Sequence, residues 1–275
     1  MKLKNKMSSI KSYYFFSLAE LKQNYLAYKS RFMLWVFANT IVLLVQLFLW
    51  LAIYNNASTA TINGFSKMEI LNYCIISKII EAFTYVSFEA KVAKDLDNGN
   101  ITMNLIKPIN YRVELFFRAF GSILGSIVLF VPVYVLIWLI VNKFKVYFCG
   151  LQSLLFFISL INAFLLNYFI CLICSSFLIK TIKSKGIYFL KLTIINFLSG
   201  AFFPLAFLPF KVHQIINFLP FIQLRSVPIE IFMRRIIGKE IFINFFISIF
   251  WIFIFYQLSS YLWNRQLKKL ESFGG

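Results

Sequence analysis

Lys78 and Glu81 are the residues in this 275-residue chain whose types and spacing most clearly allow chemistry. They lie three residues apart, so on a helix their side chains meet and neutralise each other, which makes burial of both charges tolerable. Such a pair can mark a polar point on a path through the protein or a seam between subunits. It can equally be a self-satisfied structural pair or belong to a helix that lies only partly in lipid, and the sequence leaves these interpretations open.

Cys171 and Cys174 form a C-x-x-C pattern, which can indicate metal binding or redox chemistry. No second Cys or His cluster accompanies them, and they fall in an apolar stretch of membrane-crossing length. We therefore interpret them as small packing residues. His213, the single histidine, has no Cys or carboxylate near it in sequence and is expected to be a surface or interfacial residue.

Motifs for catalysis are missing from the sequence. The chain contains no G-x-x-x-x-G-K-[ST] phosphate loop, no H-E-x-x-H and no G-x-S-x-G. Without a phosphate loop the chain cannot hydrolyse ATP in the manner of such proteins. We expect no catalytic, metal-binding or cofactor-binding residue here, and no enzymatic activity of its own.

The composition indicates the protein class. Hydrophobic residues make up 60% of the chain and charged residues 14%, and the mean hydropathy is +0.78. These values are far from those of a soluble domain, so we predict an all-α, multi-pass membrane protein in contact with lipid. The excess of 28 Lys and Arg over 10 Asp and Glu then reflects basic loops facing an anionic leaflet, and no nucleic-acid partner is expected.

Hydrophobic runs predict six membrane-spanning helices in a single domain over residues 32–263. An amphipathic interface helix is expected within residues 1–31, and a tail over 264–275. The spans are expected at about 32–54, 69–90, 113–141, 151–179, 187–203 and 241–263. Asn39 and Gln46, seven residues apart in the first span, share a face that we expect to pack inside the bundle.

The distribution of Lys and Arg predicts the orientation. Basic residues concentrate before the first span, between the second and third, between the fourth and fifth, and after the last. The positive-inside rule therefore places both termini in the cytosol. The basic residues between 206 and 240 count against this arrangement in part. Four prolines interrupt that apolar outer region, and we infer one or two short re-entrant or interfacial helices between 204 and 235.

The stretch from Asp95 to Arg112 is the longest polar interruption on the inner side. Asn98, Gly99 and Asn100 signal a turn, and Lys107-Pro108 signals the end of an ordered element. A short element is therefore expected over 101–106. A short helix is favoured, although the alternation of apolar residues is also compatible with a strand.

The stretch Gly99–Tyr111, G-N-I-T-M-N-L-I-K-P-I-N-Y, resembles the inner-loop pattern of bacterial ABC-2 type transporter permeases, in which a Gly-x-Ile…Leu-Ile/Leu-Lys/Arg-Pro-x-x-Tyr segment follows the second span. The segments Ser199–Pro209, Asn217–Phe221, Pro228–Glu230 and Glu271–Gly275 are similar to the same family, in the same order. The resemblance runs nearly from end to end of the chain.

This resemblance implies a six-span exporter subunit of the bacterial cell membrane. Such a permease pairs with a second permease, itself or a sister chain, and with separate ATP-binding subunits that bind ATP and magnesium. The resemblance also implies an N-terminal interface helix, cytosolic coupling helices and short outer helices. A membrane-embedded lipid-modifying enzyme and a non-transporting immunity or sensor protein are the alternatives.

Three sets of residues follow from these expectations. Coupling to the ATPase is assigned to Asp95, Asp97, Gly99, Ile101, Leu105, Lys107, Pro108, Arg112, Lys183 and Lys185. The path or dimer seam is assigned to Asn39, Gln46, Lys78 and Glu81. The re-entrant outer region is assigned to Pro204, Pro209, Pro220, Pro228 and Glu230.

Overall fold

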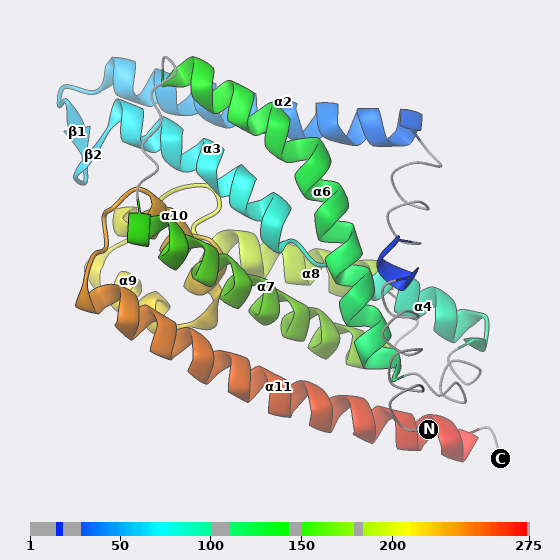
Figure 1. Cartoon of the computed structure of the whole chain (residues 1–275). Helices are drawn as coiled ribbons and strands as arrows, with labels where there is room; N and C mark the ends of the chain where they lie inside the picture. The colour runs from blue at the N-terminus through cyan, green and yellow to red at the C-terminus, as the bar shows by residue number, and fades with distance from the viewer. Residues whose placement is uncertain (1–14, 19–28, 101–109, 143–149, 179–183, 274–275) are drawn as a thin grey trace.

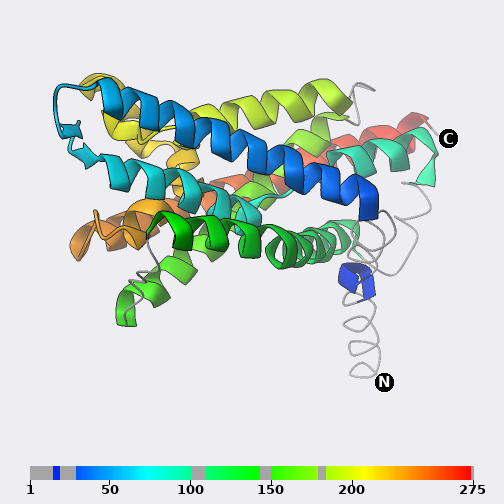
Figure 2. The same cartoon turned by 90° about the horizontal axis from the view of Figure 1, so that it is seen from above.

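The computed structural model describes residues 15–18, 29–100, 110–142, 150–178 and 184–273, and the structural statements below concern these residues. Long helices dominate the fold and run roughly along one axis, reversing direction from each to the next (Figures 1 and 2). They are α2 (Lys29–Asn56), α3 (Lys67–Thr84), α6 (Tyr111–Val141), α7 (Gly150–Leu178), α8 (Ser184–Leu198) and α11 (Lys239–Phe273).

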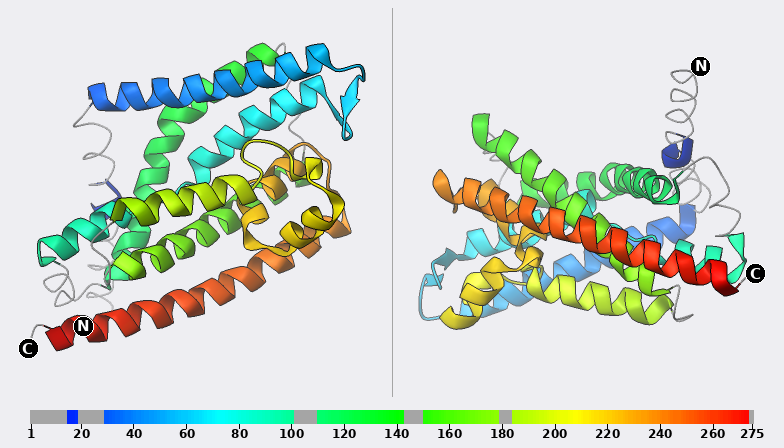
Figure 3. Two further views of the ribbon diagram at one scale, coloured as in Figure 1. Left: turned by 180° about the vertical axis from the view of Figure 1, so that it is seen from behind. Right: turned by 90° about the horizontal axis from the view of Figure 1, so that it is seen from below.

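Because the helices alternate in direction, their connections gather at two ends of the bundle. One end carries a two-stranded hairpin, β1 (Thr61–Ile62) and β2 (Phe65–Ser66), and we name it the hairpin end. The opposite end carries α4 (Glu89–Asp97), and we name it the α4 end. Residues 15–18 and the C-terminal part of α11 also lie at the α4 end (Figures 1 and 3).

Five helical stretches of the described chain are long and apolar enough, by length and composition, to cross a membrane. They are Met33–Asn56, Lys67–Asp97, Tyr111–Val141, Gly150–Leu178 and Lys239–Gln266. They lie at the predicted first, second, third, fourth and last spans. The predicted fifth span, 187–203, corresponds to a shorter apolar helix, Gly186–Leu198. The fold class is therefore helical and multi-pass.

The predicted second span, 69–90, is not one continuous helix. α3 ends at Thr84, and α4 begins only at Glu89. The Thr84 carbonyl accepts a hydrogen bond from Asn167 of α7 at 2.7 Å, and the Val86 carbonyl accepts one from Lys191 of α8 at 2.9 Å. These side chains from other helices satisfy carbonyl groups at the end of α3, where intrahelical partners are missing.

The hairpin was not predicted, although the sequence carries its signal. Asn63 and Gly64 have φ angles of 46° and 75°, the left-handed pair that a tight hairpin turn requires. Ser66 then caps α3 in a reciprocal arrangement with Glu69, which fixes where the helix starts. Tyr54 of α2 donates to the Phe65 carbonyl at 2.7 Å, so the hairpin also joins α2 to α3.

Short helices replace a continuous helix in the proline-rich region. They are η2 (Leu205–Phe207), α9 (Phe210–Phe218), η3 (Pro220–Leu224) and α10 (Ser226–Phe232). Pro204 and Pro209 directly precede η2 and α9, Pro220 opens η3, and Pro228 lies near the start of α10. Proline tolerates these positions because the first helical N–H groups have no intrahelical acceptor.

Apolar clusters hold the long helices together. One joins α3 and α7 to the short helices, with Ile80 and Ile229 fully buried in it. A second joins α2, α3 and α6 around Leu43. A third joins α4, α6 and α7 around Val92 and Leu115. Outside these clusters α2 and α11 carry many exposed apolar side chains, as expected for surfaces in contact with lipid or another membrane helix.

Gly121 of α6 lets the N-terminal segment approach closely. Ser17 donates to the Phe117 carbonyl at 2.8 Å, and a Cβ added at Gly121 would clash with the backbone of Ser17 at its carbonyl oxygen. Most of the predicted N-terminal interface helix lies outside the described residues. Its described piece, 15–18, is packed on α6 by way of this glycine.

We expect Gly121→Ala to destabilise the fold by about 1–3 kcal/mol, because backbone atoms of Ser17 must move to admit the methyl group. Unfolding in mixed detergent micelles measures the change. Gly186→Ala in α8 is the matched control, since a Cβ there meets nothing within 4 Å and alanine favours the helix. Equal stability of the two variants would contradict the close approach.

Candidate functional site

A cavity of about 270 Å³ lies between α2, α3, α6 and α8. Its polar lining residues come from all four helices. Among them are Asn39, Lys78, Glu81, Tyr85, Ser126, Tyr188 and Asn196. The cavity therefore brings together three of the residues assigned from sequence to a path or seam, namely Asn39, Lys78 and Glu81.

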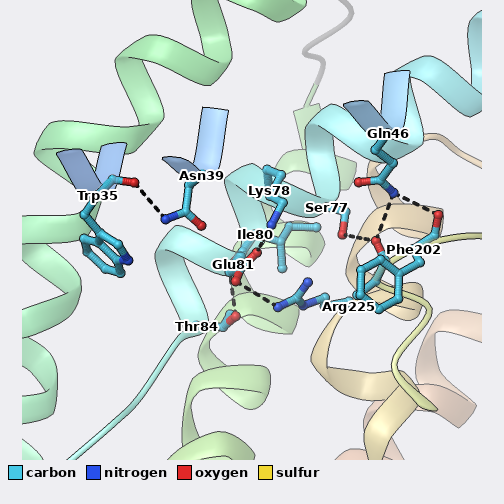
Figure 4. A network of polar contacts seen from close by, with 11 residues as sticks. Trp35, Asn39, Gln46, Ser77, Lys78, Ile80, Glu81, Thr84, Phe202 and Arg225 are labelled. Atoms are coloured by element: carbon cyan, nitrogen blue, oxygen red, sulfur yellow. Dashed lines mark hydrogen bonds and ion pairs between the residues drawn. The ribbon is translucent and has the colours of Figure 1, made fainter. Parts of the chain in front are cut away.

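Lys78 and Glu81 form the predicted ion pair, with Lys78 Nζ 2.9 Å from Glu81 Oε2. A second cation completes the cluster: Arg225, just before α10, lies 3.3 Å from Glu81 Oε1. Figure 4 shows both cations pointing at the one carboxylate. The Lys78, Glu81 and Arg225 side chains are 13%, 24% and 6% exposed, so the cluster is largely buried, and it carries one excess positive charge.

Sequence reasoning missed Arg225, which is the residue that links this cluster to the short helices. A signal for it exists, because an arginine inside the apolar run 199–233 requires a partner. The partner could not be named from sequence, since Glu81 lies far away in the chain. η3 and α10 place Arg225 by packing on α7, and α10 also packs on α3.

Gln46 and Asn39 share a face of α2 as predicted, but they have different partners. Gln46 Nε2 donates to the carbonyl of Phe202 at 2.8 Å, in the segment after α8, and the same side chain approaches the Ala201 carbonyl (Figure 4). The Ser77 hydroxyl also donates to Ala201. Asn39 donates within α2, to the Trp35 carbonyl at 2.9 Å. Gln46 thus fastens α2 to the bundle, while Asn39 lines the cavity.

At the α4 end, Glu89 and Lys191 form an ion pair that is almost completely buried, with side chains 0% and 1% exposed. Glu89 is the first residue of α4 and Lys191 lies in the middle of α8. Lys191 also donates to the Val86 carbonyl. This pair was missed as well, although a single lysine in the apolar run 187–198 signals a buried partner. It joins α4 directly to α8.

Asp95 was expected to face solvent, where it could contact a partner, but it faces inwards. It is 8% exposed and accepts hydrogen bonds from Lys91 at 2.8 Å and from Tyr111 at 2.7 Å. Arg112 likewise points into the bundle, where it donates to Ser260 of α11 at 2.9 Å and lies over the Tyr256 ring. Both residues hold the polar stretch to α6 and α11, because their charges are engaged within the chain.

The remaining coupling residues divide into described and undescribed positions. Asp97 is exposed, and Gly99 has a φ of 67° in the predicted turn after α4. Ile101, Leu105, Lys107, Pro108 and Lys183 lie outside the described residues, as does the predicted element 101–106. Lys185 belongs to α8, but its side chain is not described. Their positions relative to a partner therefore stay predictions.

Residues considered for catalysis are not gathered at one place. His213 lies on α9, where its ring contacts Asn217 at 3.2 Å, and it does not line the cavity. Cys171 is buried and Cys174 half-buried within α7. Among the residues that the structure describes, no group of three or more His, Cys, Asp and Glu side chains could hold a metal ion.

Glu230 of α10 has a local role. Its carboxylate accepts a hydrogen bond from the Ser226 hydroxyl at 3.0 Å. Its carbonyl accepts from the Arg235 N–H, so this residue stabilises the end of α10.

Comparison with known proteins identifies the family. A family model described as ABC-2 family transporter protein matches residues 40–274, which include most of the cavity lining, α4 and the proline-rich region. No curated protein matches the sequence. The family is one of transport membrane proteins rather than of enzymes. Since the match extends over most of the chain, this protein belongs to the ABC-2 transporter family.

Proposed function

We propose that this chain is the permease subunit of an ATP-driven exporter and that ATP is hydrolysed by a separate ATP-binding subunit, which also holds the magnesium. The observation that supports this role best is the fastening of the α4 end to three long helices. Glu89 of α4 binds Lys191 of α8, and Asp95 of α4 accepts from Tyr111 of α6. Arg112, the next residue of α6, donates to Ser260 of α11. A push on α4 would therefore reach α8 and α6 directly and α11 through α6.

Closure of the partner's nucleotide-binding subunits would supply that push. It would act on α4, on residues 101–106 and on the basic loop 180–186, where Asp97, Lys107, Lys183 and Lys185 offer charges. The long helices would then move against a second permease, itself or a sister chain, and change access to a path between the two. The energy comes from the partner, so the differential contacts of the two states must lie at the α4 end.

The proposed topology keeps six spans, with α8 as the fifth. Its 15 residues cover roughly 22 Å at ~1.5 Å per residue, less than the ~30 Å hydrocarbon core. The short helices that follow would complete the crossing as re-entrant elements sheltered by α3, α7 and α11. Both termini would lie in the cytosol of a bacterial cell, because Lys and Arg concentrate before the first span, between the second and third, between the fourth and fifth, and after the last.

Deletion of 101–106 is expected to abolish co-purification of the ATPase, or to lower its substrate-stimulated turnover at least about tenfold, because the coupling element no longer reaches the partner. Pull-down of the tagged chain followed by an ATPase assay measures both. Lys211→Ala, an exposed change on α9 at the hairpin end, is the control and should leave both unchanged. Normal assembly and turnover of the deletion variant would refute the coupling role.

A further inference from the structure

We propose that the cavity between α2, α3, α6 and α8 binds an amphiphile with an acidic head group, the head beside Lys78 and the apolar chain along α2 and α8. The claim that this ligand is the cargo of an exporter rests on the proposed function. The claim that the cavity binds it does not depend on that function.

The charges of the cavity favour an anion. Lys78 and Arg225 together share one carboxylate, that of Glu81, and Glu81 is the only acidic residue among the described residues that line the cavity. The cluster therefore keeps one excess positive charge. Partly buried charges interact more strongly than charges in bulk water, so this excess charge attracts a single anionic group.

Lys78 is the cation placed to meet the ligand. It lines the cavity, whereas Arg225 does not, and its ammonium group has three donors of which Glu81 Oε2 takes one. Tyr85 and Tyr188, whose hydroxyls lie 2.7 Å apart, line the same cavity and add polar atoms for the oxygens of a head group. A carboxylate or phosphate beside Lys78 would restore charge balance.

The walls of the cavity favour an apolar chain. Trp35, Val42 and Phe202 line it and are themselves 42%, 50% and 48% exposed, so they form its mouth on the outer surface of the bundle. α2 packs mainly on α3, and α8 mainly on α4, α7 and η3, which leaves the mouth between α2 and α8. A chain lying there would cover apolar surface while its head reached Lys78.

The test compares three probes with the purified chain in phosphatidylcholine nanodiscs, without any ATPase. The probes are cis-parinarate, a fluorescent long-chain carboxylate read by energy transfer from tryptophan; the corresponding alcohol; and acetate as a competitor. We expect the carboxylate to bind about tenfold tighter than the alcohol, as a charge-assisted hydrogen bond would give. Acetate should not displace it, because acetate lacks the chain.

Variants test whether Lys78 causes the preference for the carboxylate over the alcohol. Lys78→Met should reduce carboxylate binding to the level of the alcohol while alcohol binding stays unchanged, and Lys78→Arg should keep the preference. Lys67→Met, on the same helix at the hairpin end, is the matched control. Equal binding of carboxylate and alcohol to the unaltered chain would overturn the proposal even if a variant failed to fold.

Two further outcomes would overturn it: a carboxylate preference that survives Lys78→Met, or displacement by acetate, which would indicate a small-anion site only. The experiments distinguish failure of the binding site from failure of the exporter role. A preference for the carboxylate in a chain that has no ATPase partner would support the binding site and contradict the exporter role. Coupling to an ATPase without that preference would support the exporter role and contradict the binding site.

Discussion

Lys191→Met is expected to destabilise the protein by about 3–5 kcal/mol, because it leaves the Glu89 carboxylate buried without its counter-charge. Both side chains are almost completely buried, so water cannot replace the lost partner. The Val86 carbonyl loses its donor as well. Unfolding in mixed detergent micelles, followed by helical circular dichroism, measures the loss.

The double variant Glu89→Gln, Lys191→Met should recover most of that stability, because no uncompensated charge is left behind. Lys94→Met, an exposed change on the same short helix as Glu89, is the control and should change stability by no more than about 0.5 kcal/mol. If the double variant were as unstable as Lys191→Met alone, the ion pair would not be the source of the effect. In that case the coupling of α4 to α8 would need another basis.

Local sequence patterns predicted the long helices well. The apolar runs that predicted spans at 32–54, 113–141, 151–179 and 241–263 fall on α2, α6, α7 and α11, because a run of that length can satisfy its backbone only as a helix in lipid. The turn at Gly99 was also predicted, since a turn depends on residues within a few positions of one another.

Contacts between distant segments could not be read in the same way. At the end of α3, side chains of α7 and α8 donate hydrogen bonds to the carbonyls of Thr84 and Val86. No residue near Thr84 in the sequence predicts these contacts, so the end of the helix could not be predicted. The hairpin is a different case, because the Asn63-Gly64 turn signal is local and was simply not used.

In the candidate site, too, local spacing predicted some residues and tertiary contacts place the others. Lys78 and Glu81 were found from their spacing on one helix, whereas Arg225 reaches Glu81 only because η3 and α10 fold back on α3 and α7. The inward orientation of Asp95 is likewise a tertiary effect, set by Tyr111 at the start of the next long helix.

Glu81→Gln is expected to cost about 3–5 kcal/mol, and more than either Lys78→Met or Arg225→Met. Loss of the carboxylate leaves two shielded cations side by side with no anion between them, an excess of two charges. Loss of Lys78 instead leaves Glu81 paired with Arg225, a balanced arrangement, and loss of Arg225 leaves the equally balanced Lys78–Glu81 pair.

The order of stabilities therefore tests the three-residue cluster itself. Unfolding of the three variants in mixed micelles should place Glu81→Gln lowest, with Lys78→Met the mildest because Lys78 is more exposed than Arg225. A Lys78→Met variant less stable than Glu81→Gln would mean that Arg225 does not balance Glu81. The cavity would then have no excess positive charge to offer, and the same result would remove the reason for an anionic ligand beside Lys78.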